Sequence, residues 1–215
     1  SIQSIALSQD GTRLASAAVT TIEIWDLATR KCILTLKEAP LHIQSITWLQ
    51  DGTRLALVSI DAAAGIWDLA TKQFILTHRA HSKIYLVAWS QDGSRIALVL
   101  HYMTILIWDQ ATGQWISMYR GHSDQIISIA WSQDKTRLAS GSEDETIGIW
   151  DPAIRQCTSI LHGNNGPVRL ITWSQDGTRL ASASDDRTVR IWDLSTQQCI
   201  STLKGGTNRC SMFVW

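Results

Sequence analysis

The pair Trp-Asp recurs five times along this 215-residue chain at a nearly constant interval. Its tryptophans are separated by 42, 41, 42 and 42 residues and stand at Trp25, Trp67, Trp108, Trp150 and Trp192. A second motif, SQDGTR or a close variant, keeps the same interval and begins at Ser8, Leu49, Ser90, Ser132 and Ser174. Two motifs that share one period indicate that a single structural unit is repeated along the chain.

Each unit of the repeat contains four short runs with the composition of β-strands. In the fourth unit these runs span residues 126–131, 137–142, 146–151 and 157–161. The first two runs are joined by Gln-Asp-Gly or a variant, a turn signal in which glycine adopts positive φ without steric cost. Four antiparallel strands in about 40–45 residues are typical of one blade of a β-propeller, so we expect an all-β fold.

The sequence of the units resembles that of a known family over the whole chain. The stretch HSDQIISIAWSQDKTRLASGSEDETIGIWD, residues 122–151, resembles the consensus of WD-repeat β-propellers. A second stretch, SQDGTRLASASDDRTVRIWDLSTQQCISTLKG at 174–205, is most similar to the C-terminal repeat arrays of fungal and bacterial STAND proteins, the NACHT-type signalling ATPases. The first resemblance implies a propeller fold, and the second implies a sensor region in a signalling protein.

The period divides the chain into five complete blades and the start of a sixth. We place the blades at about 1–37, 38–78, 79–119, 120–161 and 162–204, with 205–215 beginning a further blade. The residue that ends each inner strand is Leu7, Trp48, Trp89, Trp131, Trp173 and finally Trp215. Since a sixth inner strand is surplus to a five-blade ring, we expect a truncated array from a ring of about seven blades. A five-blade ring with a swapped or dangling tail remains the alternative.

The resemblance gives the Trp-Asp tryptophan a structural role. In the family, this Trp, a Ser or Thr on the second strand, an Asp in the following turn and a His before the first strand form one hydrogen-bonded chain. The fourth unit has all four residues and the fifth has Asn in place of His; the matching positions are His122, Ser140, Asp144 and Trp150, and Asn164, Ser182, Asp186 and Trp192. A serine bound inside a blade is not an exposed nucleophile, so we interpret the His-Ser-Asp set as structural and not catalytic.

The earlier units lose part of this chain. The third has Leu98 and Tyr102 at the Ser and Asp positions, and the second has Leu57 at the Ser position but keeps Asp61. Removing both partners of a buried hydrogen bond is nearly neutral, whereas removing one leaves the other unsatisfied. Asp61 is therefore an expected orphan.

Propellers of this family bind partners mainly on the face that carries the loops before the inner strands and the turns before the third strands. By register, the candidate partner-binding residues on that face are His42, Gln44, Ile60, Lys83, Tyr85, His101, Gln125, Ile127, Glu143, Arg169 and Asp185. Their mixture of both charges with aromatic and amide groups suits a protein or peptide surface. The alternative is that they are solvated loop ends.

Composition narrows the classes of partner and site. Lys and Arg number 19, as do Asp and Glu, so no net charge favours nucleic acid, and no apolar run reaches the roughly 18 residues of a membrane-inserted helix. The absence of CxxC and of glycosylation sequons favours a cytoplasmic location. Cys32, Cys157 and Cys199 share one repeat position, where we interpret them as small hydrophobic residues. His78 and His81 form an HxxH without a third ligand, so we expect neither metal nor cofactor.

These features favour a non-enzymatic scaffold or ligand-sensing propeller. A propeller that binds a small ligand or performs catalysis in its central channel is the alternative. Such a site needs convergent polar groups on the inner strands, and those present there, such as Ser128 and Arg169, form no acid-base pair. The chain contains no GxxxxGK[ST] motif, so it carries no P-loop nucleotide site of its own.

Overall fold

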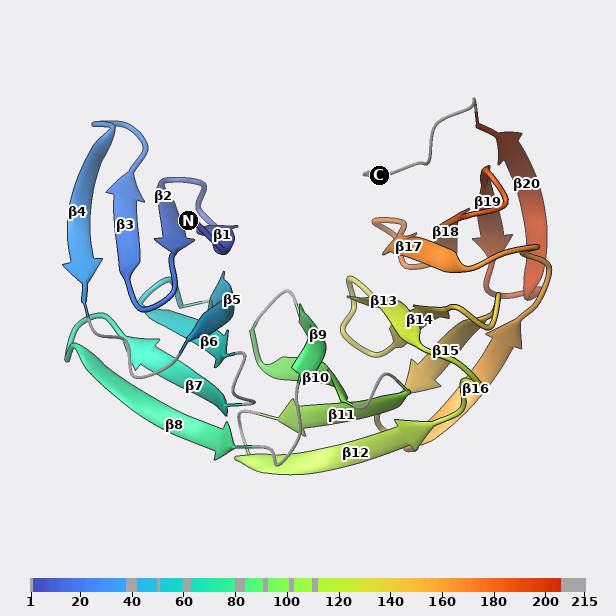
Figure 1. Cartoon of the computed structure of the whole chain (residues 1–215), viewed down its shortest axis with the longest axis horizontal. Coiled ribbons are helices and arrows are strands. Elements are labelled where there is room, and N and C mark those ends of the chain that lie inside the picture. Colours follow the sequence, from blue (N-terminus) through green and yellow to red (C-terminus); the bar gives the residue numbers. More distant parts are fainter. Residues whose placement is uncertain are drawn as a thin grey trace. The chain divides into compact units, whose positions relative to one another are not determined.

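The computed structural model of the chain describes residues 2–37, 42–49, 51–59, 63–79, 84–90, 93–100, 103–109 and 112–205. These residues form twenty β-strands and no helix, in five sheets of four strands each. Within each sheet, or blade, the strands lie side by side in chain order (Figure 1). The expected all-β fold of four-stranded blades is thus confirmed. No helix in this described part of the chain is long and apolar enough to cross a membrane.

The strands follow the repeat closely. Blade 1 contains β1 (Ser4–Leu7), β2 (Arg13–Ala17), β3 (Ile22–Asp26) and β4 (Lys31–Leu36). Blade 2 contains β5 (Ile43–Trp48), β6 (Arg54–Ser59), β7 (Ala63–Asp68) and β8 (Gln73–Arg79). Blade 3 contains β9 (Ile84–Trp89), β10 (Arg95–Leu100), β11 (Thr104–Asp109) and β12 (Gln114–Arg120). Blade 4 contains β13 (Ile126–Trp131), β14 (Leu138–Ser142), β15 (Ile147–Asp151) and β16 (Gln156–Leu161). Blade 5 contains β17 (Val168–Trp173), β18 (Arg179–Ser184), β19 (Thr188–Asp193) and β20 (Gln198–Lys204).

The blades belong to two compact units that are described separately. Unit 1 comprises Ser1–Val87 with Asp92–Ser94, and unit 2 comprises Ala88–Gln91 with Arg95–Trp215. Blades 1 and 2 lie in unit 1, and blades 4 and 5 lie in unit 2. The division runs through blade 3, whose strand β9 contributes residues to both units.

The SQDGTR motif builds the turn between the first two strands of a blade. In blade 5, Ser174 Oγ donates to Asp176 Oδ1 at 2.6 Å and accepts the Arg179 amide at 2.9 Å. The turn glycine, Gly177, has φ of +67°, a left-handed conformation that favours glycine. Lys135 occupies this position in blade 4 with φ of +64°. The second motif of the repeat is therefore a turn, held by its own side chains.

A bulge recurs where the Trp-Asp strand meets the outer strand. In blade 4 the register shifts between Ile149 and Trp150, so that Trp150 pairs with Cys157. Blades 1, 3 and 5 shift at the same place, while blade 2 shifts earlier, between Ala64 and Gly65. A bulge inserts an extra residue and re-aims neighbouring side chains, which explains the fixed pairing of the tryptophan with the first residues of the outer strand.

Within each unit, neighbouring blades pack through apolar faces. We call the face that covers the next blade in the chain the forward face, and the side that receives it the rear face. In unit 2 the forward face of blade 4 (Ala139, Ile147, Ile149, Leu161) shares one buried cluster with the rear face of blade 5 (Val168, Ile171, Trp173). In unit 1 the same positions of blades 1 and 2 form the equivalent cluster, with Leu36 beside Ile43, Ile46 and Trp48. Burial of these faces is the main driving force that joins the blades.

In blades 1 and 4 an arginine of the forward face contacts the following blade. Arg137 lies 5.0 Å from the centroid of the Trp173 ring and donates to the carbonyl of Gly177 at 2.7 Å. In unit 1, Arg13 makes the same two contacts, 4.7 Å from the Trp48 ring centroid and 2.8 Å from the carbonyl of Gly52. The arginine of SQDGTR thus combines a cation–π contact with a hydrogen bond between blades, and we call it the clasp arginine.

In blades 2, 4 and 5 the tryptophan at the end of the inner strand also joins blades, whereas Trp89 of blade 3 has a buried Nε1 without a hydrogen-bond partner among the described residues and blade 1 has Leu7 at this position. The Trp173 indole donates to the carbonyl of Ala130 at 3.0 Å, and Trp131 donates to the carbonyl of Ala88 at 3.1 Å. Trp48 donates likewise to the carbonyl of Ala6 at 3.0 Å. The tryptophans of the repeat therefore serve two recurrent purposes, one within a blade and one between blades.

Candidate functional site

The His-Ser-Asp set of blade 4 forms one buried chain with Trp150. The indole of Trp150 donates to Ser140 Oγ at 2.8 Å, and Ser140 Oγ lies 2.7 Å from His122 Nε2. His122 Nδ1 lies 2.9 Å from Asp144 Oδ2. Because an indole N–H can only donate, Ser140 accepts from Trp150, and with a neutral imidazole Ser140 donates to His122 Nε2 while Nδ1–H donates to Asp144. Every polar atom along this chain has a partner.

This chain fixes two loops against the body of the blade. His122 precedes β13, and Asp144 lies in the turn between β14 and β15, where it accepts from Thr146 and from the Ser123 amide. Gly121 leaves room for the tryptophan, since a Cβ on it would lie 2.6 Å from the Trp150 ring. The network therefore positions the loop before the inner strand next to the turn before the third strand.

The serine of this set has none of the exposure that a nucleophile needs. Ser140 is 0% exposed, and its hydroxyl is shared between Trp150 and His122. Nucleophilic catalysis requires an attacking oxygen that a substrate can reach. The geometry of blade 4 is consequently that of a structural network.

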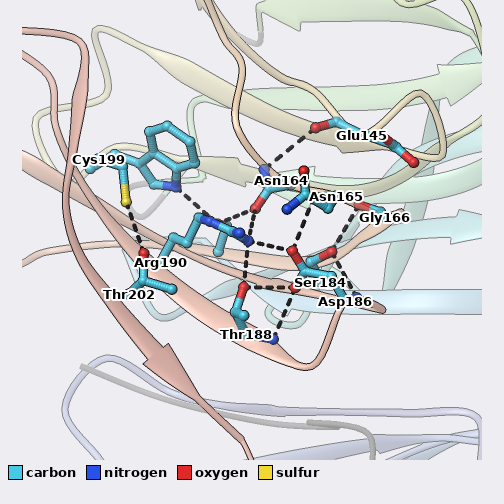
Figure 2. A network of polar contacts seen from close by, with 12 residues as sticks. Glu145, Asn164, Asn165, Gly166, Ser184, Asp186, Thr188, Arg190, Cys199 and Thr202 are labelled. Atoms are coloured by element: carbon cyan, nitrogen blue, oxygen red, sulfur yellow. Dashed lines mark hydrogen bonds and ion pairs between the residues drawn. The ribbon is translucent and has the colours of Figure 1, made fainter.

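In blade 5 the equivalent network is completed by an arginine that the repeat pattern does not predict. Trp192 donates to Ser182 Oγ at 2.9 Å, but Asn164 lies 3.4 Å from that hydroxyl and does not reach Asp186. Arg190 closes the gap: its guanidinium donates to Asp186 Oδ2 at 2.6 Å, to Asn164 Oδ1 at 3.3 Å and to the hydroxyl of Thr188 (Figure 2).

Arg190 occupies a position that the repeat assigns to the middle of the third strand. It pairs in register with Ser182, where blade 4 pairs Gly148 with Ser140. Only 8% of Arg190 is exposed, and Asp186 is similarly buried at its side chain. Asn164, which stands where the family has His, therefore does not join Ser182 to Asp186 by itself, because its amide side chain is shorter than an imidazole and Arg190 completes the link. The signal available in the sequence was a cation inside a strand of the one complete unit whose His is replaced by Asn.

In blade 2 the loss of the serine leaves an unsatisfied donor. Among the described residues, Trp67 Nε1 is buried and has no hydrogen-bond partner. Leu57 stands at the position that Ser140 has in blade 4 and offers the indole no acceptor. The expected orphan, Asp61, lies outside the described residues. Blade 1 retains its pair, with Trp25 donating to Ser16 at 3.2 Å.

The candidate partner-binding residues of unit 2 lie together at one end of blades 4 and 5. Arg169 on β17 forms ion pairs with Glu143 at 3.2 Å and with Asp185 at 2.7 Å, the two acids coming from the turns of adjacent blades. The carbonyl of Gln125 accepts the Glu143 amide at 2.8 Å, and half-buried Ile127 follows on β13. We call Gln125, Ile127, Glu143, Arg169 and Asp185 the rim.

Of the other candidates, three lie in unit 1 and three lie outside the described residues. In unit 1, His42 is exposed and Gln44 is half-buried, with Gln44 Oε1 buried and unpaired among the described residues. Tyr85 is half-buried on β9. Ile60, Lys83 and His101 lie outside the described residues.

No metal site emerges from the described side chains, since no three His, Cys, Asp or Glu residues gather closely enough in that part of the chain. Cys32, Cys157 and Cys199, interpreted from the sequence as small hydrophobic residues, are exposed on the outer strands. Each thiol instead contacts a carbonyl two residues onward on its own outer strand, as Cys199 does with Ser201.

The two network carboxylates make stability sensitive to acid. Burial raises the pKa of Asp144, but hydrogen bonds from Thr146 and the Ser123 amide, together with nearby His122, outweigh this effect. The net result lowers the pKa from its ordinary 3.8 to about 2. Burial also raises the pKa of Asp186, and bonds from Thr188, the Asn165 amide and Arg190 lower it to about 2. A carboxylate whose folded pKa is depressed stabilises the fold above its unfolded pKa and loses that contribution as pH falls towards the folded value.

We therefore predict that stability is constant down to about pH 5 and falls between about pH 4 and 2. Urea unfolding at a series of pH values measures this fall, which is expected to be smaller in Asp144→Asn. Glu145→Gln removes an exposed carboxylate from the same turn and serves as the control. Equal falls in the two variants would contradict the assigned role of Asp144.

Comparison with known families supports the assignment of the repeats. Residues 113–151 and 155–193 match the family described as WD domain, G-beta repeat. Each match begins at the outer strand of one blade and ends at the Trp-Asp strand of the next, so 113–151 runs from β12 to β15. No curated protein is significantly similar to the chain. Proteins with such repeats are typically scaffolds for protein–protein interaction.

Proposed function

We propose that the chain is a non-catalytic interaction module that binds a protein or peptide at the rim of blades 4 and 5. One observation carries the proposal: Arg169, with 40% of its side chain exposed, is held between Glu143 and Asp185 on two adjacent turns. A charged group in a fixed position gives a partner a defined point of recognition without ordering a flexible side chain on binding.

The networks beneath the rim support this role. Asp144 and Asp186 lie one residue after Glu143 and Asp185, and both accept hydrogen bonds from the loops before the inner strands, from the Ser123 and Asn165 amides respectively. The rim turns are therefore preorganised. In blade 4 the same network also occupies Ser140 and His122, the two residues that a hydrolase would use for catalysis. Rigid presentation of polar groups favours binding to a protein surface.

A finer proposal is that the array senses a ligand for a STAND-type signalling protein in the cytoplasm. The support for it is the wording of residues 174–205, which is most similar to the repeat arrays of such proteins. The parent open reading frame tests it directly: a P-loop nucleotide-binding domain upstream of the repeats is expected, and its absence would overturn this part.

Site-specific photo-crosslinking in cells of the source organism tests the binding proposal. A photoreactive amino acid at Gln125, on the rim, is expected to link a discrete protein, whereas one at exposed Gln133, in the turn at the other end of β13, is not. Arg169→Glu is expected to reduce the rim crosslink about tenfold, the effect of about 1.4 kcal/mol of binding energy. Identical crosslinks from both positions, or none from Gln125, would rule out the rim as the binding site.

Arg169→Glu is a suitable probe because it spares the fold. The ion pairs of Arg169 are exposed, and exposed pairs contribute at most about 1 kcal/mol to stability. A thermal melt within a few degrees of the wild type is expected and confirms that any lost crosslink reports on binding.

A further inference from the structure

The forward face of blade 5 carries the same residue types as the forward faces of blades 1 and 4. Those faces are buried, but the face of blade 5 is exposed. Leu203 is 57% exposed, whereas the equivalent Leu36 and Leu161 are 6% and 1% exposed. Val189 and Ile191 are half-buried, whereas Ile147 and Ile149 at the same positions of blade 4 are buried. A face of this composition is an interaction surface for an apolar strand.

The clasp arginine of this face is also unused. Arg179 stands at the position of Arg13 and Arg137, yet it is exposed, and its guanidinium makes no hydrogen bond or ring contact with a described residue. The hollow beside Arg13 is lined by its own turn and by Asp51 and Gly52 of the next blade. The hollow beside Arg179 is lined only by its own turn, from Ser174 to Arg179. An occupant of this face must therefore offer the arginine a ring and a carbonyl.

We propose that residues 210–215 of the same chain dock on the forward face of blade 5 as an inner strand, with the Trp215 ring against Arg179. The rear face of a blade contacts the preceding blade through three positions. In blade 2 they are Ile43, Ile46 and Trp48, and in blade 5 they are Val168, Ile171 and Trp173. Adding 42 to the last set gives Cys210, Phe213 and Trp215. These three residues are all apolar, they end in the required tryptophan, and they lie outside the described residues.

A second copy of the chain is the competing occupant, because the rear face of blade 1 is exposed at Ile2, Ile5 and Leu7. That face has Leu7 where blades 2 and 5 have tryptophan. A leucine offers neither a π face to Arg179 nor an indole N–H to a carbonyl of blade 5. The clasp therefore favours residues 210–215 over a second copy.

The register supplies a disulfide test that uses a native cysteine. A Cβ built on Gly141 lies 3.1 Å from Cβ of Val168, close to the roughly 3.5–4.5 Å of a disulfide. One repeat later, these positions are Ala183 and Cys210. Ala183→Cys, in a background with Cys32, Cys157 and Cys199 changed to serine, is expected to form an intramolecular disulfide with Cys210 when oxidised with diamide.

The matched control is Ala17→Cys in the same background, because Ala17 occupies the same position of blade 1 but shares its cluster with Ile43 and no cysteine. It is expected to keep both thiols reduced by intact mass. Disulfide-linked dimers of Ala183→Cys would overturn the proposal, because they would show that residues 210–215 of a second copy occupy the face. Failure to form any disulfide would overturn it outright.

Two further measurements test the docked strand by a route other than formation of the disulfide itself. In the wild-type chain, alkylation of Cys210 is expected to be roughly tenfold slower than alkylation of exposed Cys199, and to approach it in Trp215→Ala. In the Ala183→Cys chain, adding Arg179→Ala is expected to lower the effective concentration of the introduced thiol towards Cys210, measured against glutathione, about fivefold. Equal alkylation rates in the wild type, or an unchanged effective concentration, would contradict the docked strand.

Discussion

Replacing Arg190 with methionine is expected to lower the free energy of unfolding by about 3–5 kcal/mol. The loss is large because Asp186 then remains charged and buried without its cation, while Asn164 loses a donor. Breaking a buried ion pair from one side leaves an uncompensated charge, which costs far more than the pair itself contributes. Urea unfolding of wild type and variant measures the difference.

The double variant separates the ion pair from simple loss of packing. Asp186→Asn removes the charge and keeps one oxygen, for the Thr188 amide, while its NH2 group faces the Asn165 amide, so it is expected to recover only part of the loss in Arg190→Met. Lys204→Met changes an exposed cation on β20 and is expected to alter stability by less than about 0.5 kcal/mol. A loss in Arg190→Met no larger than this control would show that the pair is effectively solvated.

Ser140→Ala is expected to cost about 2–4 kcal/mol, since it orphans two buried groups at once. Trp150 Nε1 loses its acceptor and His122 Nε2 loses its donor, and each unsatisfied buried group costs about 1–3 kcal/mol. Ser159→Ala is the matched control in the same blade, because the Ser159 hydroxyl is buried and has no hydrogen-bond partner among the described residues. It is expected to be neutral, and equal losses in the two variants would refute the network as the source of stability.

The blades could be predicted because their signals are local. In the fourth unit the predicted runs 126–131, 137–142, 146–151 and 157–161 differ by at most one residue at each end from strands β13 to β16. Turn chemistry and alternation act within a few residues, and the 42-residue period sets the order of the strands.

Contacts that depend on neighbours in space were missed. The SQDGTR arginine was visible in every unit, but its cation–π contact lies on a tryptophan 35 or 36 positions onward, as between Arg13 and Trp48 or Arg137 and Trp173. Arg190 was missed because the resemblance assigns the bridging role to a histidine before the inner strand. The guanidinium enters the same network from a different strand, and only the geometry shows the substitution.

The offset between the matched repeats and the blades bears on how such an array changes length. Each match spans the outer strand of one blade and three strands of the next, so its ends fall inside a blade rather than between blades. The hydrogen bonds that the clasp arginines and the inner-strand tryptophans make between blades join residues 39 to 43 positions apart, which is close to one period. A gene segment of one period, duplicated or lost by unequal recombination, therefore rejoins equivalent residues on both sides of the break. Blade number can change in whole steps while every remaining junction keeps its chemistry.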